Sequence, residues 1–188
     1  MMEEKAEKQP QFFEEYNFEI FPNKNLKVAL FENVANCAEL KQRFLGPTAE
    51  VEMAAMDAEN ILSLYHLLIS ANLALHRSSV DKMITRNIYT EIIYNLSPST
   101  NVSDSLKKIG AQDCTTKLLC AAFNPDDEKF QALLEQVQGS LRPAADLITI
   151  NDVKAEKFKK IYKISPQELE LSSLEDAVIQ KIVTKNVV

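Results

Sequence analysis

The side chains best suited to bind a metal or attack a substrate are few in this chain, which has two histidines and three cysteines. His66 and His76 are ten positions apart in a predicted helix, so they are rotated by roughly 280° from each other and do not share a face. Cys37, Cys114 and Cys120 form no CxxC pair, and their odd number argues against a disulfide framework. We therefore expect no metal site and reduced, mostly buried thiols.

Catalytic motifs are missing as well. There is no GxSxG elbow, no cysteine has a histidine partner nearby in sequence, and the three glycines are too far apart to form a phosphate-binding loop. The carboxylates of Glu14 and Glu15 lie in a locally acidic stretch that is typical of a solvated face. We predict no catalytic residue and no cofactor. One rival hypothesis is a small-molecule enzyme with a cleft near Glu91 and Arg86.

Two basic groups stand out in a chain with a net charge of −6 and a pI near 5.1. One group surrounds residues 86–110, and its members are Arg77, Lys82, Arg86, Lys107 and Lys108. The other comprises Lys154, Lys157, Lys159, Lys160 and Lys163, with Phe158 and Tyr162 interleaved. Cations mixed with aromatic rings can bind single-stranded nucleic acid by pairing phosphates and stacking bases. The alternative is a helix with solvated lysines and a buried stripe of Phe158, Ile161 and Tyr162.

The stretch RNIYTEIIYNLSPSTNVSDSLKKIG at 86–110 has the outline of a helix-turn-helix. A DNA-reading helix would begin with Arg, Asn or Gln directed at base edges. The second helix begins instead with Val102, Ser103, Asp104 and Ser105, and the aspartate would repel phosphate. We therefore exclude DNA sequence reading and interpret the apolar stripes as core packing, formed by Ile88, Ile92, Leu96, Val102, Leu106 and Ile109.

The elements that must position these residues are visible in the apolar pattern. Residues 1–15 are predicted to be a flexible acidic leader, and 16–188 a single domain that opens with a hairpin around Pro22 to Asn25. Helices are predicted after caps at Asn36, Ser63, Asn101 and Asp127, and after Ser172 or Ser173. Strands are predicted at 115–123 and 147–150, while 49–60 reads as a loop or a short irregular strand. The fold class is α/β (α+β), with several helices covering a mixed, mainly antiparallel sheet.

Four stretches resemble one known family, the PRPK-binding proteins, which are the Cgi-type subunits of the KEOPS, or EKC, complex. The stretches are KMITRNIYTEIIYNLSPSTNVSDSLKKIG at 82–110, LISANLAL at 68–75, KKIYKIS at 159–165 and the ending LEDAVIQKIVTKNVV. They follow the order of the family over roughly residues 16–188. The spacing of the four stretches together carries the resemblance, since none is a catalytic signature.

The resemblance implies a non-enzymatic subunit of the machinery for threonylcarbamoylation of adenosine 37 in tRNA (t6A). Its implied partners are the atypical kinase/ATPase subunit, the other KEOPS subunits through that kinase, and tRNA, whose 3′ end archaeal relatives help to hold. The implied tRNA-binding residues are Lys82, Arg86, Asn87, Lys159 and Lys160. For the kinase we favour the last helix, because an apolar band can serve a partner as well as a core, with Val178, Ile179, Ile182 and Val183. An alternative is a kinase-binding scaffold without direct RNA contact.

One position departs from the family. Where relatives have a Gly-Lys turn, this chain has Asp81-Lys82, and the added acid would weaken or reshape a phosphate contact. The N-terminal residues are acidic and polar, unlike a secretory signal, and no apolar run approaches the ~20 residues of a membrane span. We therefore expect no membrane partner and a location in the cytoplasm and nucleus.

Overall fold

The computed structural model describes residues 12–44, 51–148 and 151–186. Within them, five strands form one sheet in the order β1-β2-β4-β3, and β5 pairs with β2 beyond the end of β1. Every pairing is antiparallel. The strands are β1 (Glu14–Asn17), β2 (Asn25–Glu32), β3 (Ala54–Asp57), β4 (Leu118–Phe123) and β5 (Ser140–Arg142). The predicted fold class is confirmed.

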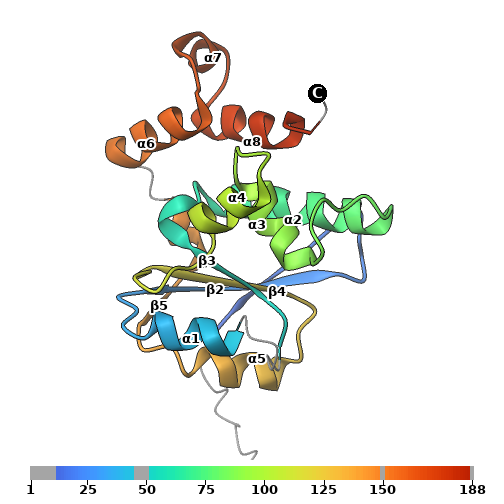
Figure 1. The fold of residues 1–188 in the computed structure, drawn as a ribbon, viewed down its shortest axis with the longest axis vertical. Coiled ribbons are helices and arrows are strands. Elements are labelled where there is room, and N and C mark those ends of the chain that lie inside the picture. The colour runs from blue at the N-terminus through green and yellow to red at the C-terminus, as the bar shows by residue number, and fades with distance from the viewer. Residues whose placement is uncertain (1–11, 45–50, 149–150, 187–188) are drawn as a thin grey trace, which may run out of the picture.

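The helices lie on both faces of this sheet. Figure 1 shows α1 and α5 on one side, α2, α3 and α4 on the other, and α6, α7 and α8 as a further layer beyond them. This cover explains why the central strand, NLKVALFE, is buried on both faces and does not alternate apolar with polar residues. The helices are α1 (Cys37–Phe44), α2 (Leu64–Ser79), α3 (Ile88–Leu96), α4 (Val102–Ile109), α5 (Asp127–Leu134), α6 (Asp152–Tyr162), α7 (Pro166–Leu171) and α8 (Leu174–Thr184), with short 3-10 helices at Ala58–Asn60 and Ala144–Ile148.

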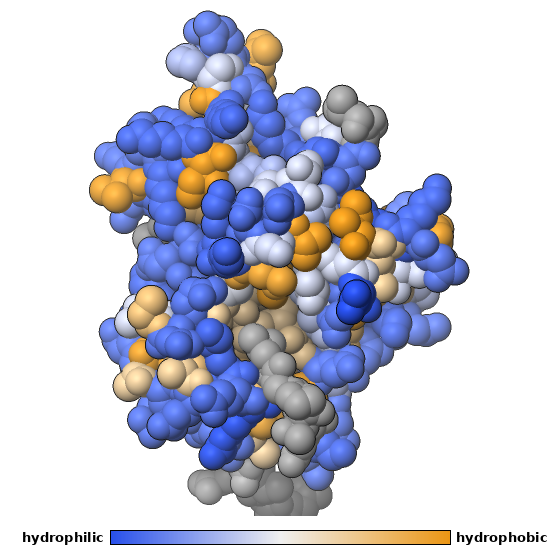
Figure 2. Space-filling view, in the orientation of Figure 1, coloured by the Kyte–Doolittle hydropathy of each residue, from blue (hydrophilic) through white to orange (hydrophobic). Residues whose placement is uncertain are grey.

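Two apolar clusters hold these layers together. The larger one packs both faces of the sheet against α1 to α5. The smaller one joins α6 and α8 to α2, around the fully buried Phe158, Val178 and Ile182. The surface drawn in Figure 2 is mainly hydrophilic, with small apolar patches between the charged side chains. None of the helices in the described ranges has the length and apolarity to span a membrane.

Several boundaries differ from the sequence expectation. The hairpin is present, but its first strand begins at Glu14, and Phe13 packs against the core with its ring 5.5 Å from that of Phe130. Residues 12–15 of the predicted leader are therefore part of the fold, and 1–11 lie outside the described residues. The stretch 49–60 contains a strand, β3. The predicted strand at 147–150 is wrong where the structure describes it, because 147 and 148 end a 3-10 helix.

The helix-turn-helix outline is present in α3 and α4. Core packing is confirmed for Ile92, Leu96 and Ile109, while Leu106 is 38% exposed. Most predicted caps are also found. The Ser63 hydroxyl accepts a hydrogen bond from the His66 N–H, and the Asn101 side-chain oxygen accepts one from the Asp104 N–H. The cap of α5 is one residue earlier than predicted, at Asp126.

Candidate functional site: a basic loop on a buried carboxylate

Three of the predicted tRNA-binding residues come together in the segment 80–87, which joins α2 to α3 and is called here the basic loop. Lys82, Arg86 and Asn87 are all exposed. Within the described part of the chain, neither the Lys82 ammonium nor the Arg86 guanidinium has an ion pair or a hydrogen bond. Both charges are therefore available to an external anion.

Asn87 has a structural duty as well, because it is the N-cap of α3. Its side-chain oxygen accepts hydrogen bonds from the backbone N–H of Tyr89, at 2.7 Å, and of Thr90, at 3.3 Å. The NH₂ group makes no bond within the described residues, so it can donate to a ligand. At the other end of the loop, Asp81 has a φ of 53°, the left-handed conformation that glycine adopts most easily and that aspartate tolerates.

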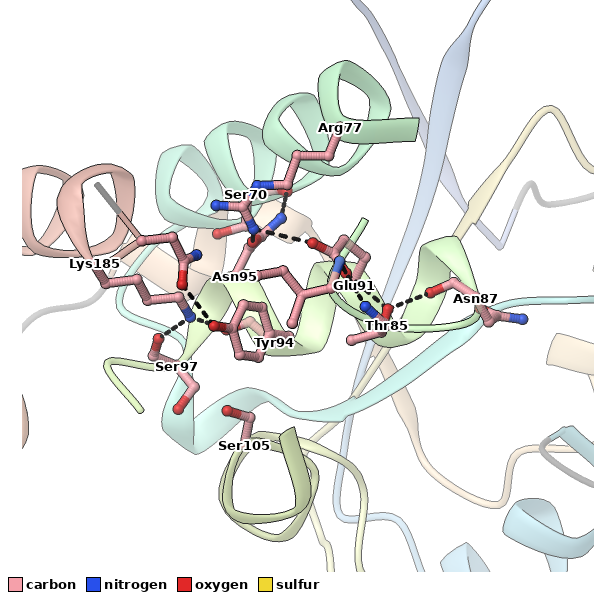
Figure 3. Close-up of polar contacts among 12 residues, drawn as sticks. Ser70, Arg77, Thr85, Asn87, Glu91, Tyr94, Asn95, Ser97, Ser105 and Lys185 are labelled. Carbon is pink, nitrogen blue, oxygen red and sulfur yellow. Dashed lines mark hydrogen bonds and ion pairs between the residues drawn. The ribbon is translucent and has the colours of Figure 1, made fainter. Parts of the chain in front are cut away.

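The basic loop is anchored from below by Glu91, which has no exposed surface. Its Oε2 accepts from the backbone N–H of Ile84 at 3.1 Å, and from the N–H and hydroxyl of Thr85, each at 2.8 Å. Its Oε1 accepts from the Arg77 guanidinium at 3.0 Å. Figure 3 shows the carboxylate between α2 and the loop. Because three donors belong to the loop, one buried side chain fixes the backbone that carries Lys82 and Arg86.

Arg77 extends this network into the helix pair. Its guanidinium also donates to the Asn95 side-chain oxygen at 2.7 Å, and the Asn95 NH₂ donates to the backbone oxygen of Ser70 at 3.1 Å. Ser70 and Asn95 are fully buried. The basic loop is thus tied to both α2 and α3 by charge-assisted bonds in a region of low dielectric constant, where such bonds are strong.

A second polar cluster lies at the C-terminal end of α3. The Lys185 ammonium donates to the backbone oxygens of Tyr94 and Ser97 and sits 3.7 Å from the centre of the Tyr94 ring. Burial lowers the pKa of Lys185 to about 7, the Arg77 charge adds to this, and Glu91 acts in the opposite direction. Figure 3 shows Lys185 and Asn87 at opposite ends of the network. α3 therefore connects the basic loop to the end of α8.

A groove of about 500 Å³ opens beside Asn87, between α1, β3, α3 and α4. We call it the α3–α4 groove. Its lining includes the apolar side chains of Phe44 and Ile93, and two lysines, Lys41 and Lys107. Lys41 is in an ion pair of 2.7 Å, whereas Lys107 is exposed and unpaired within the described residues. The volume is typical of pockets that hold a small ligand or the end of a chain.

The two other predicted tRNA-binding residues, Lys159 and Lys160, lie on α6. Lys160 is exposed, and Lys159 forms an ion pair of 2.8 Å with Glu156. Figure 1 shows α6 well apart from the loop between α2 and α3, so the five residues do not form one patch. Phe158 and Tyr162 are buried, as expected for a helix with solvated lysines, whereas Ile161 is 38% exposed. The buried rings of Phe158 and Tyr162 therefore cannot stack on nucleic-acid bases.

The predicted kinase-binding band on α8 needs a correction. Val178 and Ile182 have no exposed surface and belong to the smaller apolar cluster with α2 and α6, so neither can contact a partner directly in this structure. Ile179 and Val183 are half-buried at the edge of the same cluster. The helical period placed all four on one face, and a single-chain core occupies the centre of that face. Only its edge remains for a partner.

The histidines, the cysteines and Glu91 were the remaining candidates from the sequence. No group of three or more metal-ligating side chains occurs in the described ranges. His66 is fully buried, its Nδ1 accepts from the Leu62 N–H, and burial lowers its pKa to about 3. Among the cysteines Cys114 is exposed, and all three are free thiols. Glu91, the acid of the rival enzyme hypothesis, has no exposed surface and accepts hydrogen bonds at both of its oxygens.

Sequence reasoning missed the anchoring role of Glu91 and the groove beside Asn87. The signal for the first was present: Glu91 is the one acid in an otherwise apolar or uncharged helix, IYTEIIYNL, whose residues are mostly buried. A lone acid in such a helix must find partners, and Arg77 precedes it in the chain. The groove had no comparable signal, because its lining comes from four separate elements.

The fold and these contacts define a single-domain α+β protein in which buried polar residues order a basic surface segment.

Comparison with known proteins then specifies the class further. The chain belongs to the family described as kinase binding protein CGI-121, whose family model matches residues 31–186. It is 30% identical over 173 residues to the EKC/KEOPS complex subunit TPRKB of Danio rerio, which covers 91% of this chain and 97% of that protein. It is 33% identical over 144 residues to the EKC/KEOPS complex subunit cgi121 of Aspergillus fumigatus, and 25% identical over 154 residues to that of Schizosaccharomyces pombe. These matches cover 73% and 80% of this chain, and 75% and 88% of the two fungal proteins.

Proposed function

We propose that this chain is a non-catalytic subunit of an EKC/KEOPS complex that acts in t6A formation on tRNA in the cytoplasm and nucleus. In this proposal it binds the atypical kinase/ATPase subunit and helps to recruit the tRNA 3′ end. The observation that carries the proposal is the family match over 31–186, together with relatives named as subunits of this complex. The names of these relatives, which are given as subunits of a complex, support a role without catalysis.

For the RNA we propose the basic loop and the adjoining α3–α4 groove. Lys82 and Arg86 offer two unpaired cations for phosphates, and the Asn87 NH₂ group offers a donor between them and the groove. The Glu91 anchor supports this assignment, because a fixed loop loses less conformational entropy on binding than a flexible one. A single-stranded end fits a groove of this size better than a duplex does.

For the kinase we propose the outer edge of α8, represented by Ile179 and Val183. They are half-buried, so each keeps part of an apolar side chain for a partner while its inner part packs in the smaller cluster. Figure 1 shows α8 on the outside of the molecule, beyond the layer of α2 and α3. A partner docked there would pack against the exposed parts of Ile179 and Val183, whose inner parts already pack in the smaller cluster.

The first test is co-purification of the chain with the kinase-like subunit from cells. A one-to-one complex is expected for the unaltered chain, and loss of that complex is expected for Ile179→Glu, which should remain folded. Absence of the kinase from the purified unaltered chain would refute the subunit assignment.

The second test measures tRNA binding by the purified complex at several salt concentrations. Lys82→Glu combined with Arg86→Glu should weaken binding at least about tenfold. It should also make the plot of log K against log salt concentration less steep, by the amount expected for the loss of roughly two phosphate contacts. The matched control is Lys24→Glu with Lys129→Glu, two exposed lysines on the β1–β2 turn and on α5. A tRNA without its 3′ CCA end should respond less to the change. Unchanged affinity would favour the alternative, a kinase-binding scaffold without RNA contact, which the acidic net charge of −6 supports.

A further inference from the structure

A second basic surface lies on the outer helical layer, at a distance in sequence from the basic loop. Two adjoining hollows, of about 400 and 480 Å³, lie between α4, α6 and α8. They share Pro98, Lys108, Ile161 and Tyr162, so they form one continuous depression. We call it the lysine-rimmed groove. In Figure 2, apolar side chains reach the surface in the upper part of the view, where α4 and α6 to α8 lie.

The charge of this groove is opposite to that of the chain. Lys108, Lys163, Lys181 and Lys185 line it, and the described residues of its lining include no aspartate or glutamate, although the chain has a net charge of −6. Lys181 is in an ion pair of 2.7 Å at the rim, and the Lys185 ammonium is bonded to backbone oxygens. The other two lysines are exposed and make no side-chain bond within the described ranges. The groove is thus complementary to a ligand with several negative charges.

The accessible apolar surface of the groove is aliphatic, because the two aromatic residues that also line it, Phe158 and Tyr162, are buried. Ile161 is 38% exposed, unlike Phe158 and Tyr162 on the same helix, and Pro98, which lines both hollows with it, is half-buried. The rings of Phe158 and Tyr162 stack on each other at 5.8 Å, and both are buried, so they offer no open ring face to a base. Binding of single-stranded RNA relies on such open faces. An aliphatic side chain is therefore a better occupant than a nucleobase.

The position of one rim lysine is held by backbone structure. Lys163 ends α6 with a φ of 52°, and its N–H and that of Ile164 return to the carbonyls of the last helical turn. Glycine is the residue that adopts this conformation without strain. The chain has a cation at this place instead, at the rim of the groove.

We propose that the lysine-rimmed groove binds a short acidic segment of a partner protein, in which an aliphatic side chain is flanked by carboxylates. The aliphatic side chain would pack on Ile161 and Pro98, and the carboxylates would pair with Lys108 and Lys163. This surface is separate from the basic loop proposed for tRNA and from the outer edge of α8 proposed for the kinase. It adds a third contact site to the protein.

The test uses the full chain and a fluorescein-labelled peptide of eight residues, six Glu or Asp around two central Leu. Fluorescence anisotropy should show saturable binding, and Lys108→Glu with Lys163→Glu should weaken it at least about tenfold. The pair Lys24→Glu with Lys129→Glu should leave the affinity unchanged. Replacing the two Leu by Ser, or the acids by their amides, should each reduce binding by a similar factor.

Lys163→Gly separates the functional role from a structural one. Glycine fits the left-handed backbone, so this variant should unfold at the same or a higher temperature and still bind the peptide more weakly. The proposal is overturned if the peptide does not bind, if the Leu-to-Ser peptide binds equally well, or if the Lys108 and Lys163 variants bind it normally. Binding of an eight-nucleotide uridine RNA that these variants lose, without a matching loss of peptide, would assign the groove to nucleic acid instead.

Discussion

Replacing Glu91 by Gln tests whether a buried carboxylate holds the basic loop. Gln has the same shape but one oxygen instead of two. If that oxygen faces Arg77, the Gln NH₂ group points at the donors of Ile84 and Thr85; if it faces the loop, the NH₂ group points at the guanidinium. Neither orientation satisfies all the donors that the carboxylate satisfies.

The size of the effect follows from the burial of the pair. Removing one partner of a buried ion pair costs about 3 to 5 kcal/mol, because the other charge stays buried without compensation. The Arg77 side chain is 14% exposed and keeps its bond to Asn95, which favours the lower end of that range. We expect Glu91→Gln to lower the free energy of unfolding by about 3 kcal/mol, or the melting temperature by about 6 to 12 °C.

Urea unfolding at pH 7 measures this loss, and hydrogen exchange locates it. Protection of the Ile84 and Thr85 amides should fall more than that of the sheet, because both amides donate to Glu91. The control is Glu170→Gln, an exposed acid on α7 that should change the stability by less than about 0.5 kcal/mol. A loss below about 1 kcal/mol with unchanged amide protection would refute the anchoring role of Glu91.

Three further predictions concern single buried or capping residues. Burial lowers the pKa of His66 from 6.5 to about 3, so below pH 6.5 the unfolded chain binds a proton that the native chain does not. Between pH 6.5 and about pH 3 this residue should therefore remove about 1.4 kcal/mol of stability for each unit by which the pH falls. Urea unfolding between pH 7 and 5 should show a smaller change of stability with pH for His66→Gln, and an equal change would contradict this. Ile182→Glu buries a charge in the smaller cluster and should destabilise the chain by more than about 4 kcal/mol, whereas Ile179→Glu should destabilise it by less than about 1.5 kcal/mol. Thermal unfolding measures both losses, and equal losses would mean that Ile182 is not part of the core. Asn87→Ala should cost about 1 kcal/mol as a lost helix cap, while Asn87→Asp keeps the cap and should weaken only tRNA binding; an equal loss of stability in both variants would count against the cap geometry.

The secondary structure near strong local signals was predictable. Ser63 and Asn101 precede helices whose apolar residues recur at helical spacing, and their side chains cap those helices in the structure. The Leu147 to Ile150 run was predicted as a strand and is a 3-10 helix where it is described, because a short apolar run is compatible with several buried conformations. β3 was ambiguous because the stretch 49–60 has no clean apolar period.

The candidate site was predictable in part. Charge alone identified a basic group that includes Lys82 and Arg86, and the resemblance to the family selected these two residues from it. The burial of Ile182 was not predictable. The helical period shows that α8 has an apolar face, but it does not show whether the chain itself or a partner covers that face. Only the packing of α8 on α2 and α6 decides that question.

The sequence by itself determined the family, the mainly antiparallel α+β fold class, most of the helix caps and the basic character of the loop, because these depend on local chemistry and on patterns along the chain. The tertiary structure alone decided that Glu91 anchors that loop, that a groove opens beside Asn87, and that four lysines gather around the exposed Ile161 between α4, α6 and α8. Those features bring together residues that are far apart in sequence. Their contacts form only when the helical layers pack on the sheet and on each other.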